Sequence, residues 1–205
     1  MANTTFTGPV RSLNGFETVS KNATTGAITI TSGNKMAVEA IAGAGIEGTA
    51  ETYITQVERF KSDTDTNVNL VKTTIMIDLT GLRSTAAGDI IGKNGAGIAY
   101  IAQVTTANQG VVFGVSMSCY ETPAGGDPDI NLHSADEGTG VEDTAISALT
   151  ETLIINGGDA AAGTRTAGGT IAADQYLYLT AGATTDATYT AGRLVIEILG
   201  YDVAS

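Results

Sequence analysis

Residues 53–79 read YITQVERFKSDTDTNVNLVKTTIMIDL, and this stretch decides the class of fold. From residue 71 to residue 79, odd-numbered residues are apolar or threonine and even-numbered ones are polar, with Met76 as the exception. A period of two is typical of a β-strand with one buried face and one wet face. The polar residues 62–67 separate it from another strand at residues 53–61, which predicts a hairpin. The expected buried face is Val71, Thr73, Ile75, Ile77 and Leu79.

Similar signals along the chain predict an all-β protein. Residues 193–201 are apolar on both faces, which indicates a strand that is central in its sheet or lies at a subunit contact. Residues 37–46 are ambiguous between a short helix and irregular structure, because three glycines interrupt or follow them. The low-complexity residues 157–169 are expected to form a mobile loop. Further strands are expected at residues 27–31, 97–104, 111–120, 148–155, 175–180 and 193–201.

About nine strands with almost no helix favour a β-sandwich, of jelly-roll type, for residues 17–205 as a single domain. Residues 1–16 are expected to form an extended arm, since Gly8-Pro9 excludes regular structure there. Such an arm is too short to bury its own apolar side chains and packs on another surface. The residues that we expect to dock are Phe6, Pro9, Val10, Arg11, Leu13 and Phe16.

The charge of the chain excludes two classes of partner. Lys and Arg total 10 against 22 Asp and Glu, a net charge of -12. Phosphates require a positive surface, so neither nucleic acid nor an anionic membrane is expected as a partner. The N-terminal residues lack the apolar core of a signal peptide, and no window approaches the roughly 20 apolar residues of a membrane span.

The sequence offers little for catalysis, and we expect no enzyme and no cofactor. His133 is the only histidine and is interpreted as a surface residue in a polar loop. Cys119 shares the parity of Val111, Phe113, Val115 and Met117 and is interpreted as a small buried hydrophobic residue. Zinc would need more Cys and His ligands than the chain has.

One acidic segment partly imitates a calcium-binding loop. Asp127, Asp129 and Asn131 match its first half, but Leu132 and Gly138 stand where glycine and glutamate are required. The preferred interpretation is a solvated acidic loop. Whether a structural cation binds near Asp127 and Asp129 stays open at this stage.

Four stretches carry a resemblance to a known family: FTGPVRSLNGF (6–16), IDLTGLRSTAAGDIIG (77–92), CYETPAGGDPDINL (119–132) and TYTAGRLVIEILGY (188–201). They resemble virion structural proteins of marine tailed phages, of the head decoration or capsid-stabilising (cement) type. The resemblance implies a place on the outer surface of the capsid, binding to the major capsid protein, and self-association, commonly as a homotrimer. It brings no catalytic residues.

Three functional hypotheses follow. The first is a decoration or cement protein that stabilises a phage head shell. The second is a receptor-binding or fibre module that projects from the virion, for which the seven tyrosines are the candidate contacts. The third, a secreted polysaccharide-active enzyme, is disfavoured because the chain has no Trp to stack on sugars and no signal peptide.

Overall fold

The structure, a computed structural model, describes residues 17–21, 28–33, 42–46, 50–61, 67–95 and 97–204, with side chains placed for residues 42–46, 70–95 and 97–201. It is 51% strand and 5% helix, and its sheets are antiparallel. The all-β class predicted from the alternating sequence is therefore confirmed. The jelly-roll topology and the single domain of residues 17–205 stay predictions.

Contacts divide the chain into two units, Met1–Met36 and Ala37–Ser205. In the first unit, β1 (Glu17–Lys21) and β2 (Ile28–Gly33) form an antiparallel pair with a bulge between Thr18 and Val19. The second of these strands covers most of the strand expected at residues 27–31.

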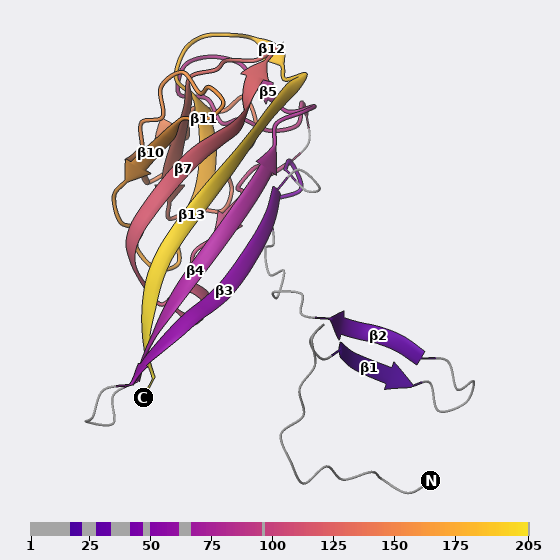
Figure 1. The fold of residues 1–205 in the computed structure, drawn as a ribbon. Coiled ribbons are helices and arrows are strands. Elements are labelled where there is room, and N and C mark those ends of the chain that lie inside the picture. The colour runs from indigo at the N-terminus through magenta and orange to yellow at the C-terminus, as the bar shows by residue number, and fades with distance from the viewer. Residues whose placement is uncertain are drawn as a thin grey trace, which may run out of the picture. The chain divides into compact units, whose positions relative to one another are not determined.

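The second unit contains a five-stranded sheet in the order β10-β7-β13-β4-β3 (Figure 1). The predicted hairpin is confirmed, because β3 and β4 pair along their whole lengths. β13 pairs with β4 on one side and with β7 on the other, so the strand that is apolar on both faces is central. The strands are β3 (Ala50–Lys61), β4 (Asn67–Asp78), β7 (Val111–Ala124), β10 (Arg165–Gly168) and β13 (Ala191–Ala204).

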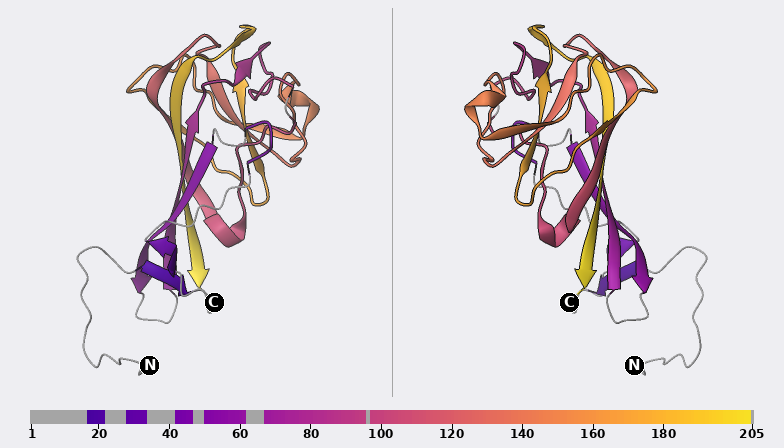
Figure 2. Two further views of the ribbon diagram at one scale, coloured as in Figure 1. Left: turned by 90° about the vertical axis from the view of Figure 1, so that its right-hand side faces the viewer. Right: turned by 90° about the vertical axis from the view of Figure 1, so that its left-hand side faces the viewer.

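A four-stranded sheet in the order β6-β11-β8-β9 packs against one face of the larger sheet (Figure 2). Its strands are β6 (Ala102–Gln103), β8 (Ile130–Ala135), β9 (Glu151–Ile155) and β11 (Tyr176–Ala181). The short strands β5 (Arg83–Ser84) and β12 (Ala187–Thr188) form a separate pair. Helix is confined, in the described part, to α1 (Thr106–Gln109) and a 3-10 turn at Ile146–Ala148.

A single apolar core lies between the two large sheets. Ile75 and Ile196 from the five-stranded sheet are fully buried, as are Leu132 and Leu179 from the four-stranded sheet. Every residue of the buried face predicted for residues 71–79 is at most 8% exposed, whereas Met76 is 48% exposed. The alternation in β4 therefore predicted both the strand and its orientation.

The alternation predicted for β7 is correct only in part. Val115, Met117 and Cys119 are buried as expected, but Val111 and Phe113 are half exposed. The reason is a β-bulge: Leu199 pairs with Gly114 and Gly200 with Val112, which leaves Phe113 unpaired. A bulge adds one residue and exchanges the two faces of the strand on either side of it.

Several other expectations are corrected by the structure. Residues 127–133, expected as a polar loop, include the start of β8, which lies between two partners in its sheet. Within the expected loop of residues 157–169, β10 pairs with β7. Of the strand expected at residues 97–104, only β6 forms, and the strand expected from residue 148 begins at Glu151. Residues 44–46 of the ambiguous segment form a turn.

Candidate functional site: the outer face of the five-stranded sheet

His133 lies in β8 and is 9% exposed, so its interpretation as a surface residue was wrong. Its Nδ1 atom lies 2.8 Å from Oε2 of Glu151 on the neighbouring strand β9. This contact joins β8 to β9, and it accounts for the presence of a histidine inside the sheet.

The loop before β8 is built around a buried carboxylate and is not a solvated acidic loop. Asp127 is 2% exposed, and its oxygens accept hydrogen bonds from the backbone N–H groups of Asp129, at 3.1 Å, and Ala183, at 2.6 Å. The Tyr189 hydroxyl donates to the Asp127 carbonyl at 2.6 Å. Asp127 therefore holds together three separate segments of chain.

Asp129 lies beside Asp127, but the environment of its own carboxyl group is less favourable. Burial, followed by the charges of Asp127 and Asp159, raises the pKa of its carboxyl. Its Oδ1 atom is buried without a hydrogen-bond partner. Among the described residues, no group of three or more His, Cys, Asp or Glu side chains is arranged to hold a metal ion.

Cys119 is 5% exposed in β7, which confirms its interpretation as a small buried residue. Burial raises the pKa of its thiol, so the nucleophilic thiolate is disfavoured. No helix in the described part of the chain is long and apolar enough to cross a membrane.

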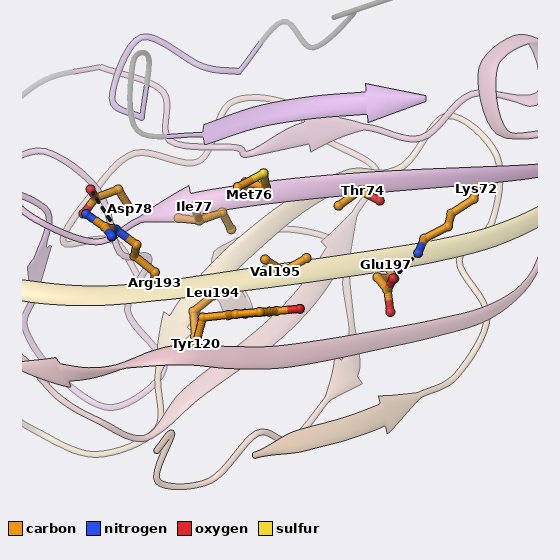
Figure 3. Close-up of a pocket in the computed structure, with 10 residues that line it drawn as sticks. All are labelled: Lys72, Thr74, Met76, Ile77, Asp78, Tyr120, Arg193, Leu194, Val195 and Glu197. Carbon is orange, nitrogen blue, oxygen red and sulfur yellow. Dashed lines mark ion pairs between the residues drawn. The ribbon is translucent and has the colours of Figure 1, made fainter. Parts of the chain in front are cut away.

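A hollow lies on the side of the five-stranded sheet that faces away from the core, and we call this side the outer face. The hollow has a volume of about 640 Å³ and is followed along the sheet by a second one of about 510 Å³. Both lie over neighbouring strands, as Figure 3 shows for the first. Of the residues whose side chains are described, the outer face includes Lys72, Thr74, Met76, Asp78, Ser116, Tyr120, Glu121, Arg165, Arg193, Val195, Glu197 and Leu199.

Apolar side chains occupy the middle of the outer face. Tyr120 is 69% exposed and Met76 is 48% exposed, and these are large side chains to leave in water. Leu199, which is 40% exposed, lies further along β13, beyond Glu197. Beyond Leu199, the exposed Phe113 lies with its ring centroid 6.3 Å from that of Tyr201. Large apolar side chains left exposed in this way mark a surface that binds another molecule.

Two clusters of charged side chains flank this apolar middle (Figure 3). In the first, Arg193 Nε lies 3.6 Å from Asp78 Oδ2 and 3.5 Å from Glu121 Oε2. The N–H and hydroxyl of Thr80, and then Arg193, lower the pKa of Asp78, so this carboxylate is charged at neutral pH.

The second cluster is centred on Glu197. Its carboxylate forms ion pairs with Lys72 Nζ and, at 3.2 Å, with Arg165 Nη2. The Arg165 guanidinium also donates to Ser116 Oγ from Nε and Nη2, at 3.2 and 2.9 Å. The guanidinium is thereby held over the sheet beside Glu197.

The outer face is electrically balanced, whereas the rest of the molecule is acidic. Of the side chains that the structure describes, those on the outer face include three cations and three carboxylates. The other described side chains include two cations and eleven carboxylates. The whole acid excess of the described side chains therefore lies away from this face.

The candidate docking residues Phe6, Pro9, Val10, Arg11, Leu13 and Phe16 lie outside the described residues. The sequence did contain one signal of the outer face, since Met76 breaks the polar side of β4. That signal could be recognised as part of a surface only when the registers of β7 and β13 were known.

A scan against protein-family models finds no match for this sequence. Searches among curated proteins and among solved structures find no similar protein either.

Proposed function

We propose that this chain is a structural virion protein that decorates a tailed-phage head and stabilises its shell, by binding the major capsid protein and copies of itself. The observation that carries the proposal is the outer face, a partly apolar and charge-balanced surface on an otherwise acidic molecule. Support for the phage head in particular comes from the resemblance of the four sequence stretches.

Physical considerations favour protein as the partner of the outer face. Three cations balanced by three carboxylates offer no net positive charge for a phosphate backbone. Exposed Tyr, Met and Arg side chains are the types that are enriched where proteins meet. The acid excess elsewhere keeps the chain soluble and disfavours association through other surfaces.

The proposal assigns a second contact to residues 1–16. Phe6, Val10 and Leu13 can each contribute roughly 1.5–3 kcal/mol on burial, less the entropy of ordering the segment. Deletion of residues 1–14 should leave the β-sandwich folded and reduce binding to particles. If the shortened chain bound to particles as well as the full chain does, the arm would have no role in docking.

The test of the proposed function is occupancy on phage heads from which this protein has been removed. Native protein should rebind to the outside of the shell and raise the temperature at which the shell melts. Binding should hold or strengthen as salt rises, because the repulsion between acidic copies is screened while apolar attraction is not.

A matched pair of variants links this binding to the outer face. Met76 and Leu153 are both 48% exposed, but Leu153 lies in β9 of the other sheet. We expect Met76→Asp to lower occupancy and Leu153→Asp to leave it unchanged. Steep loss of native binding with salt, or unchanged shell melting at full occupancy, would contradict the proposal. Binding to host cells in place of heads would favour the receptor-binding alternative.

A further inference from the structure

The charges of the outer face are arranged with opposite sign about its middle. Val195, on the central strand β13, pairs with Met76 of β4 and with Ser118 of β7. Two residues before Val195 stands Arg193, and two residues after it stands Glu197. At about 3.4 Å per residue, these opposite charges lie about 14 Å apart along the strand.

The neighbouring strands carry charges at the same two levels, and at each level their sign is opposite to that of the charge on β13. At the level of Arg193, β4 carries Asp78 and β7 carries Glu121, each of which pairs in register with Arg193. The described side chains at this end of the outer face therefore have a net charge of -1.

At the level of Glu197, the positive charges of Lys72 and Arg165 both lie beside the Glu197 carboxylate. Lys72 comes two residues before Thr74, the β4 residue opposite Glu197, but its Nζ atom reaches back to the Glu197 carboxylate. Arg165 reaches the same carboxylate from β10 while it binds Ser116 of β7. The described side chains at this end therefore have a net charge of +1.

We propose that the outer face binds the outer face of a second copy of this chain across a two-fold axis that crosses the strands at the level of Val195. This rotation reverses the strand direction and places each strand over its own equivalent. It brings Asp78 over the partner's Lys72, Arg193 over the partner's Glu197, and Glu121 near the partner's Arg165. Each of these pairs is of opposite sign and occurs twice, as an isologous contact requires.

The apolar middle of the face fits the same arrangement. Met76 and Val195 lie at the level of the axis, so each meets its equivalent in the other copy. Two sheets that pack face to face lie about 10 Å apart, which leaves room for such side chains to interdigitate. A two-fold axis along the strands would instead place like charges over one another, which is unfavourable.

The size of the contact indicates a weak dimer. Four strands about 4.8 Å apart and six residues long cover roughly 400 Å² per copy. The total of roughly 800 Å² is below the area of stable interfaces and typical of transient ones. When many copies are held on one particle, many such weak contacts together would still give strong association. The homotrimer expected from the sequence requires a head-to-tail contact and thus a different surface.

The inference rests on the proposal that the outer face binds protein, and it can be tested with two complementary variants. In the first, Asp78→Lys and Glu121→Lys make both ends of the face positive. In the second, Lys72→Glu and Arg165→Glu make both ends negative. These side chains are 38–62% exposed, so the changes should leave the fold intact. Circular dichroism and thermal melting verify this.

Sedimentation velocity at high micromolar concentration and low salt then measures association. Native protein should show a reversible species of about twice 20.8 kDa. Each variant alone should associate at least about tenfold more weakly, and an equimolar mixture of the two should form the dimer again. A control with the same change of net charge as the first variant, Asp136→Lys with Asp159→Lys, should dimerise as the native protein does, since both side chains are exposed elsewhere.

Three results would overturn the inference: a native protein that stays monomeric, variants that each associate as the native protein does, or a mixture that does not restore the dimer. No phage particle takes part in this experiment. Its failure would therefore leave binding to the shell untouched, whereas loss of shell binding by a chain that dimerises normally would contradict only the proposed function.

Discussion

Replacing Tyr189 by phenylalanine should destabilise the protein by about 1–2 kcal/mol at neutral pH. The ring is 1% exposed and packs against Gly126, where an added Cβ would lie 2.6 Å from the ring atoms. The substitution keeps the ring but removes the hydroxyl that donates to the Asp127 carbonyl at 2.6 Å. A carbonyl oxygen is then left buried without this partner, which is the origin of the cost.

The expected loss is measurable by thermal or urea unfolding. For a chain of this length, 1 kcal/mol corresponds to a shift in Tm of about 2–4 °C, so Tyr189→Phe should melt about 2–8 °C below the native protein. Tyr120→Phe is the matched control, because Tyr120 is 69% exposed and its hydroxyl is in water. It should melt within about 1 °C of the native protein.

The pH dependence of this loss provides a second check. Burial raises the pKa of Tyr189 above that of a free tyrosine. A group whose pKa is raised in the folded state contributes stability that is fully present below the unfolded pKa, near 10, and is lost at higher pH. Native protein should thus lose stability above about pH 10, and the difference from Tyr189→Phe should narrow there. An equal Tm for both proteins at pH 7, or a difference that widens above pH 10, would refute this reasoning.

Three further predictions concern single residues. Asp129→Asn should raise stability at neutral pH in urea unfolding, with a gain that fades in acid, because the raised pKa of Asp129 means that its ionised form is the costly one; an acid-independent effect would contradict this. Gly200→Ala should cost about 1–3 kcal/mol, because its Cβ would lie 1.9 Å from the Gln109 carbonyl oxygen, whereas at Gly114 the nearest atom is 4.0 Å away and Gly114→Ala should be neutral. Cys119 should react with a thiol reagent only after denaturant unfolds the chain, because its side chain is buried, and fast labelling of native protein would contradict this.

The parts of the fold that were predictable from sequence are those in which one strand carries its own pattern. The alternation of residues 71–79 predicted the buried face of β4, and the two-sided apolar residues 193–201 predicted that β13 is either central in its sheet or at a subunit contact, of which the first is observed. Both patterns are local, so no knowledge of the partner strands was needed.

The parts that were missed depend on pairing with distant residues. β10 has the sequence RTAG, without any large apolar side chain, and is a strand only because β7 offers it hydrogen bonds. β8 contains polar residues that are satisfied by the fold, since Asn131 accepts from the Gly157 N–H at 3.0 Å and His133 meets Glu151. Such residues are indistinguishable from those of a polar loop until their partners are known.

The outer face was missed for a related reason. Its charged residues come from four strands, and in the sequence the pairs Lys72–Glu197 and Asp78–Arg193 are separated by more than a hundred residues. The composition shows that the chain is acidic. The balance of charge on one face is apparent only from the strand registers, which place these residues beside Arg193 or beside Glu197.

Hydroxyl-radical footprinting of native protein, free at low concentration and bound to phage heads, tests most directly whether the outer face is the protein-binding surface. Met76, Tyr120 and Leu153 are all well exposed in the single chain, and each serves as its own reference between the two states. We predict that oxidation of Met76 and Tyr120 falls several-fold on binding while that of Leu153 is unchanged. Equal oxidation of Met76 and Tyr120 in the free and bound protein would contradict the central claim.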